Sequence, residues 1–213
     1  MQLDPQRNQS RVRQVILTAG GKINDELPPL ARTKMRSREQ IVARALVMNA
    51  MMQIYFDAPI EIIDGWIYDN GLTEHVSPAE SELLSKRTED LAHKEKIDLY
   101  WYIEGVWTLM WVGHLIDSLP FDRGVENFLA ALAPDLQNNE DGTKFQSTMR
   151  IRPFPDLFKM LDLYYRLHWY TRDGLLHEYD TGNFNHDRIM ERRRALEWVM
   201  QPSVGWDDAR LLA

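Results

Sequence analysis

Apolar positions recur at helical spacing along most of the chain after residue 36. Ser37 and Gln40 are placed to form a capping box, in which each side chain satisfies a free backbone N–H group of the other residue. Apolar residues then follow every three or four positions, at Ile41, Ala45, Met48 and Met52. This pattern predicts that the first clear helix begins at Ser37.

Two shorter helices are expected next. Pro59 begins the first, which should end near Asn70-Gly71, because glycine readily takes the left-handed conformation that closes a helix. Ser77-Pro78-Ala79-Glu80 is a strong start signal. It joins an N-cap serine, a proline at the first helical position and a glutamate that can reach back to the cap.

The longest helix is expected from about Asp90 to Ser118. Large residues fall near one stripe at about 100° per residue, namely Ile97, Trp101, Glu104, Trp107, Trp111 and His114. Much of this segment is apolar on several sides, which places it at the centre of the fold. Leu119-Pro120 should end it.

The remaining segments also read mainly as helices. The expected elements are a helix from Asp122 through Ala131, a short extended piece within Lys144–Arg152, a helix from about Pro155 to Tyr170, and a last helix from Asn185 or His186 to Met200. Asp173-Gly174 to Asn183 is expected to be a loop. About seven helices without a convincing run of strands predict an all-α fold.

Residues 1–35 are expected to form an N-terminal extension, and residues 36–213 a single helical domain around the long tryptophan-rich helix. Gly20-Gly21 and Pro28-Pro29 limit regular structure in the extension. Arg11–Leu17 fits either a short strand or a helical turn.

Composition narrows the class of protein. Hydrophobic residues make up 44% and charged residues 27% of the 213 positions, the balance of a globular protein. No apolar run is long enough to span a membrane, and the first ten residues lack the apolar core of a secretory signal. The chain has no cysteine. It therefore has no disulfide framework or thiolate metal site, and a cytoplasmic location is expected.

Charge is unevenly distributed along the chain. The formal net charge is −7, with nine basic and four acidic residues up to position 44 and 16 basic and 28 acidic residues beyond it. This acidic body is either an ordinary solvated surface or a face that meets a basic partner. Nucleic-acid binding is not expected, because it normally requires a basic surface.

Several short pieces occur in the order found in a known family. They are Arg36-Ser37-Arg38-Glu39, Ser77-Pro78-Ala79-Glu80, Trp101-Tyr102-Ile103-Glu104, Leu119-Pro120-Phe121, the run from Asp162 to Trp169, the run from Arg192 to Trp198, and Trp206-Asp207-Asp208. Over residues 32–208 the chain thus resembles the bacterial family called domain of unknown function 4272. The resemblance implies a helical fold, and it implies no activity, cofactor or catalytic residue.

Glu104 is the most informative polar position. A carboxylate among aromatic residues on a central helix needs a partner, because an unpaired buried charge is costly. Arg166, which follows Asp162 by one helical turn, is a candidate. Two interpretations remain open. One is a buried network that joins two helices, and the other is a polar pocket in which Glu104, Arg166 and His168 meet a ligand.

Other motifs point to packing rather than chemistry. Helical spacing makes core packing the simpler role for Trp101, Trp107 and Trp111, although a stacking platform is an alternative. Trp206 is late enough in the chain to lie over a surface groove, so Trp206, Asp207 and Asp208 form a candidate surface. No two histidines have the spacing of metal ligands, and neither a phosphate loop nor a nucleophile elbow occurs. No metal or cofactor is therefore expected.

These observations support two main hypotheses. The first is a non-catalytic interaction protein of the bacterial cytoplasm with a protein partner, which would be a toxin or effector that it neutralises. The second is a small-molecule-binding or enzymatic domain with its pocket near Glu104, Arg166 and His168. A nucleic-acid factor that uses the basic N-terminal segment is the least favoured class.

Overall fold

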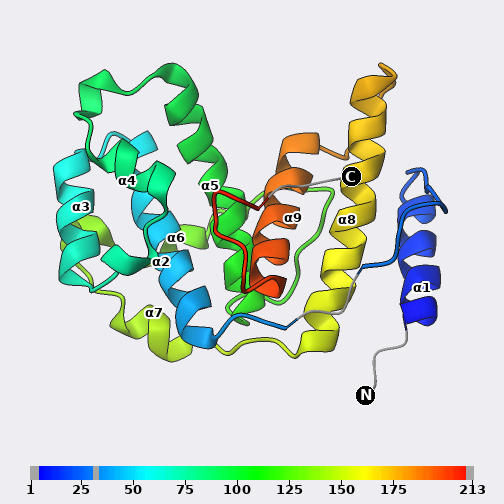
Figure 1. Ribbon diagram of the computed structural model, residues 1–213, viewed down its shortest axis with the longest axis horizontal. Helices are drawn as coiled ribbons and strands as arrows, with labels where there is room; N and C mark the ends of the chain where they lie inside the picture. Colours follow the sequence, from blue (N-terminus) through cyan, green and yellow to red (C-terminus); the bar gives the residue numbers. More distant parts are fainter. Residues whose placement is uncertain (1–4, 31–33, 210–213) are drawn as a thin grey trace.

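α-Helices make up the regular structure of the chain. The computed structural model describes residues 5–30 and 34–209, which contain nine α-helices, three short 3-10 turns and no strand (Figure 1). The helices are α1 (Pro5–Thr18), α2 (Arg38–Tyr55), α3 (Ile60–Asp69), α4 (Pro78–Leu84), α5 (His93–Val112), α6 (Leu129–Leu132), α7 (Thr143–Thr148), α8 (Phe154–Leu176) and α9 (His186–Met200). The all-α prediction is confirmed. Within the described ranges, we find no helix with the length and apolar character that a membrane crossing requires.

The larger helices pack in one row. Their contacts run in the order α3, α2, α5, α9, α8 and α1, from one side of Figure 1 to the other. Helix α2 has 13 of its 18 residues buried, which explains why it is apolar on most sides instead of along one stripe. The core therefore lies along α2, α5, α9 and α8, and α1 and α3 cover its two ends.

The helix boundaries that nearby residues predict are confirmed. Ser37 and Gln40 form the expected capping box before α2, and Ser77 and Glu80 form a second one before α4. Gly71 takes the left-handed conformation after α3, with φ of +65°. Each of these signals depends only on residues within one turn of the helix end.

The predicted helix from Asp90 to Ser118 is too long at both ends. Helix α5 ends at Val112 because residues 150–152 take its last carbonyl groups. The backbone N–H groups of Arg150 and Arg152 donate to Gly113 and Val112, at 2.8 and 2.9 Å. The guanidinium of Arg152 donates to the Trp111 carbonyl at 2.7 Å. The longest helix of the described residues is α8, not α5.

The segment between α5 and α8 also differs from the prediction. Only residues 129–132 form the helix α6, because the carbonyls of Pro120 and Arg123 accept hydrogen bonds from Arg192 of α9 instead of closing helical turns. Residues 143–148 are the helix α7 and not part of an extended piece.

Helix α8 continues six residues past its predicted end. Gly174 lies within its last turn and is no helix breaker here. A Cβ atom at Gly174 would lie 2.4 Å from a Thr181 side-chain carbon, so glycine lets the following loop pack closely on the helix.

The N-terminal segment contains a full helix. Residues 11–17, expected as a strand or a helical turn, belong to α1, which lies along α8 (Figure 1). Val12 and Ile16 are buried against the rest of the core. The Asn8 side chain donates a 2.7 Å hydrogen bond to Asp162 of α8.

Arg36 connects the start of α2 to the end of α9. Its backbone N–H donates to the Val199 carbonyl at 2.9 Å, and its Nε donates to the Trp198 carbonyl at 2.7 Å. The same guanidinium lies over the Trp198 ring, 4.0 Å from the centroid, and also donates to the carbonyls of Gln201 and Val204. These bonds hold the segment after α9 against the beginning of α2.

Candidate functional site

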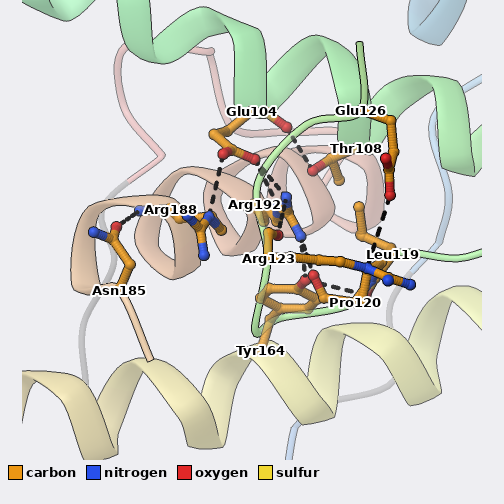
Figure 2. Close-up of polar contacts among 10 residues, drawn as sticks. All are labelled: Glu104, Thr108, Leu119, Pro120, Arg123, Glu126, Tyr164, Asn185, Arg188 and Arg192. Atoms are coloured by element: carbon orange, nitrogen blue, oxygen red, sulfur yellow. Dashed lines mark hydrogen bonds and ion pairs between the residues drawn. The ribbon is translucent and has the colours of Figure 1, made fainter. Parts of the chain in front are cut away.

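Glu104 lies in a buried ionic cluster between α5 and α9 (Figure 2). Its Oε2 atom is 2.7 Å from both Nε and Nη2 of Arg192, a forked contact with one side of the guanidinium. Its Oε1 atom is 3.3 Å from Nε of Arg188, one turn earlier on α9. The side chain of Arg192 is completely buried, so this ion pair is well shielded from water.

Arg192 also binds the chain that follows α5. Its Nη1 donates to the Tyr164 hydroxyl at 3.0 Å and to the Pro120 carbonyl, and its Nη2 donates to the Arg123 carbonyl at 3.1 Å. The Tyr164 hydroxyl in turn donates to the Leu119 carbonyl at 3.2 Å. Burial raises the pKa of Tyr164 to about 12, so its proton remains available for this bond. The cluster fixes α5, α8, α9 and residues 119–123 together.

Arg166 is not the partner of Glu104. It pairs with Asp162 on its own helix, with 3.0 Å between Nε and Oδ1, and Asp162 also accepts the bond from Asn8. Burial raises the pKa of Asp162, while the neighbouring Arg166 charge opposes the shift. This second pair joins α8 to α1 and leaves the Glu104 cluster to Arg188 and Arg192.

His168 belongs to a third buried group. Its Nδ1 lies 2.7 Å from Nη1 of Arg193, and the Nε of Arg193 donates to Glu197 at 2.8 Å. Burial and the Arg193 charge lower the pKa of His168 to about 3, so the ring is neutral and accepts this hydrogen bond. The ring of His186 lies 5.2 Å away.

The expected pocket residues are therefore divided among separate networks. Glu104, Arg166 and His168 are each buried and bonded to different protein groups. They form neither the single network nor the single pocket that the sequence suggested, and each joins helices within its own network. A buried charge that already has its partners is poorly placed to exchange them for a ligand.

Trp206 is a core residue, so the expectation that it lies over a surface groove is wrong. Only 4% of it is exposed. Its ring contacts two guanidinium groups, with the centroid 4.8 Å from that of Arg44 and 4.7 Å from that of Arg194. Cation–π contacts of this kind stabilise the packing of the segment after α9.

Asp207 has a structural contact that the sequence did not indicate. Its carboxylate accepts hydrogen bonds from the Ser77 hydroxyl at 2.8 Å and from the Ala79 N–H at 2.9 Å. It therefore extends the cap of α4 from 130 residues away. Asp208 is exposed.

The tryptophans of α5 have two different environments. Trp107 and Trp111 are buried in the core, as helical spacing predicts. Trp101 is only half-buried and lines a groove with Tyr102. No cluster of three or more potential metal-binding side chains occurs among the described residues.

This groove, which we call the acidic groove, lies between α4, α5 and α9 and has a volume of about 670 Å³. Seven carboxylate residues line it, from three helices and the segment after α9. They are Glu80, Glu82, Glu95, Asp98, Asp187, Glu191 and Asp207. Only two cationic residues, Lys94 and Arg194, line the same groove. Trp101, Tyr102 and several aliphatic side chains supply its apolar surface.

Some of these carboxylates are hydrogen-bonded or ion-paired to other described residues, and others are not. Glu80 pairs with Arg44, Glu95 pairs with Lys86 at 2.6 Å, and Asp98 with Lys94 at 2.5 Å. Within residues 5–30 and 34–209, the carboxylates of two further groove residues, Glu82 and Asp187, make no hydrogen bond or ion pair. These two are free to bind a cation from outside.

Glu191 is the most unusual residue of the acidic groove. It is 8% exposed, and its buried Oε2 has no hydrogen-bond partner among the described residues. The nearest cation is Arg194, at 3.8 Å. Burial raises the pKa of Glu191 to about 6, and the charges of Asp98 and Asp187 act in the same direction. An added cation would relieve this accumulation of negative charge.

Sequence reasoning missed the acidic groove because its carboxylates come from four separate segments. The sequence shows the excess of acidic residues beyond residue 44, but it does not show on which face of the fold these residues lie together. A local signal exists on α5, where Glu95, Asp98 and Trp101 follow one another at three-residue spacing and so share one helix face.

Comparison with known proteins identifies a family for the chain. A family model described as "Domain of unknown function (DUF4272)" matches residues 7–209. The chain belongs to this family, and the resemblance noted in its sequence is confirmed. The match begins in α1, earlier than the residues that carry the resemblance. No curated protein and no solved structure matches the chain.

Proposed function

We propose that this member of the family is a non-catalytic interaction protein, and that its acidic groove binds a basic segment of a partner protein. The observation that carries the proposal is the excess of carboxylates over cations in a groove with an aromatic wall. The partner is a toxin or effector that the protein neutralises in the bacterial cytoplasm. A chain with no cysteine suits that reducing compartment.

The groove offers both kinds of contact that a lysine or arginine side chain needs. Free carboxylates at Glu82 and Asp187 can form charge-assisted hydrogen bonds with an ammonium or guanidinium group. Trp101 and Tyr102 can cover the apolar stem of the same side chain or stack on a guanidinium. Acidic surfaces also attract a basic partner over a distance, which speeds association and selects against acidic proteins.

The test is affinity purification of the tagged protein from its host, comparing three forms. The first is the wild type, and the second is Glu82→Gln/Asp187→Asn, which removes two exposed, unpartnered charges from the acidic groove. The third is Glu74→Gln/Glu178→Gln, which removes two exposed charges outside it. The expected result is a basic partner that stays on the wild type and the third form and is lost from the second.

Two further measurements sharpen the experiment. The retained partner should dissociate as salt is raised, because exposed charge pairs are screened. It should also inhibit growth when it is expressed alone and not when it is expressed together with the wild type. Equal retention by all three forms would contradict the role of the acidic groove. A partner that is harmless to cells would contradict neutralisation only.

A further inference from the structure

Asn49 of α2 is a buried amide with unused hydrogen-bonding capacity. It is 2% exposed, and neither its side-chain oxygen nor its nitrogen has a hydrogen-bond partner among the described residues. Buried polar side chains are normally bonded, so an amide with both atoms unpaired indicates a missing partner. The observation holds whichever way the amide is turned, because the oxygen and the nitrogen are both unpaired.

Asn49 lines a pocket on a different part of the molecule from the acidic groove. The pocket has a volume of about 480 Å³ and lies between α2, α5 and residues 125–137. Pockets of this size hold small organic molecules. No residue lines both this pocket and the acidic groove, so the two sites can be tested separately.

The walls of the pocket define the chemistry of a ligand. Apolar side chains predominate in the lining, including Met52, Ile103, Val125 and Leu129. The described lining has no lysine, arginine or histidine, and its two carboxylates are Glu126 and Asp135. An anionic ligand would find no opposite charge there. A neutral molecule with a largely apolar body fits these walls better.

We propose that this pocket binds a neutral, largely apolar molecule that carries an adjacent hydrogen-bond donor and acceptor, such as a lactam or another cyclic amide. The side chain of Asn49 has a donor and an acceptor side by side and can form two parallel hydrogen bonds with such an edge. Asparagine recognises paired donor and acceptor groups of nucleobases in the same manner. Met52 follows Asn49 by three positions on the same helix. Its side chain is unbranched and can turn aside to admit the ligand.

The probes are 2-pyridone, which presents N–H beside C=O, and N-methyl-2-pyridone, which has lost the N–H. Binding to the whole protein is followed by NMR, through the side-chain NH₂ signal of Asn49 and the methyl signals of Met52 and Ile103. We expect 2-pyridone to shift all three signals. The methylated probe should bind roughly tenfold more weakly, the difference that about one good hydrogen bond makes.

Two variants complete the test. Asn49→Leu keeps the size of the side chain and removes the amide, so it should bind both probes equally weakly. Gln137→Ala alters another residue of the pocket lining and should keep the preference for 2-pyridone. Equal binding of the two probes to the wild type would overturn the proposal, and so would the absence of any shift at millimolar probe. Both results are read on the wild type, so they stand even where Asn49→Leu does not fold.

Discussion

Replacing Glu104 by glutamine should lower the free energy of unfolding by about 3 kcal/mol. The carboxylate lies against the completely buried side chain of Arg192, and removing one partner of a buried ion pair costs about 3–5 kcal/mol. The lower end of that range applies here. Arg192 keeps its bonds to the carbonyls of Pro120 and Arg123 and to the Tyr164 hydroxyl.

Equilibrium unfolding in urea measures this loss. With a slope of about 2–3 kcal/mol per molar urea, the midpoint should fall by about 1 M while the slope stays unchanged. Arg188→Ala should cost less, about 1 kcal/mol, because that contact is longer and Arg188 is partly exposed. The control is Asp98→Asn, which breaks an exposed pair with Lys94 and should cost at most about 0.5 kcal/mol.

A loss below about 1 kcal/mol for Glu104→Gln would refute this reasoning. The buried pair would then contribute no more than a pair on the surface. Such a result would also reopen the interpretation of Glu104 as a functional residue, because a costly buried charge that adds no stability needs another reason to be present.

Three further changes give distinct outcomes. Burial lowers the pKa of His168 to about 3, whereas the unfolded chain binds this proton near pH 6.5. The free energy of unfolding should therefore fall by up to about 1.4 kcal/mol for each pH unit below pH 6.5. His168→Asn should flatten that part of the stability profile measured in urea. Glu191 gives the opposite pH dependence of stability. Its pKa is raised from 4.5 to about 6, so the charged carboxylate destabilises the fold as pH rises through that range. Glu191→Gln should therefore raise stability by about 2 kcal/mol at pH 7 and not at pH 4, as read from thermal melting. Asp207→Ala removes the acceptor of the Ala79 N–H and should cost about 1 kcal/mol, with faster hydrogen exchange at Ala79; unchanged exchange would show that water replaces the cap.

Local sequence signals predicted the parts of the fold that local contacts determine. The starts of α2 and α4 depend on capping boxes within four residues, and both were predictable. The end of α5 depends on Arg152, 41 residues from the carbonyl it binds, and the short α6 follows from Arg192, which takes two carbonyls of the preceding segment. No pattern near those positions in the sequence reveals such bonds.

The same distinction applies to the candidate site. The sequence predicted that Glu104 needs a partner, because its position among aromatic residues on a central helix could be recognised. It suggested Arg166, which is the wrong cation, since the true partners Arg188 and Arg192 follow Glu104 by 84 and 88 residues. Asn49 was hidden for another reason. One polar residue in an apolar helix gives no sign of whether its amide will find a partner.

The bonds of Arg36 bear on how the protein is made. Arg36 reaches the Trp198 carbonyl across 162 residues of sequence, so this contact cannot form until the ribosome has added nearly all of the described chain. At about 5–20 residues per second, the delay is roughly ten to thirty seconds. In the first part of that time α2, which buries 13 residues in the finished fold, still lacks α5, the helix it packs against most extensively. The nascent chain therefore presents a long apolar helix to solvent, and products that stop before α5 should aggregate or bind chaperones.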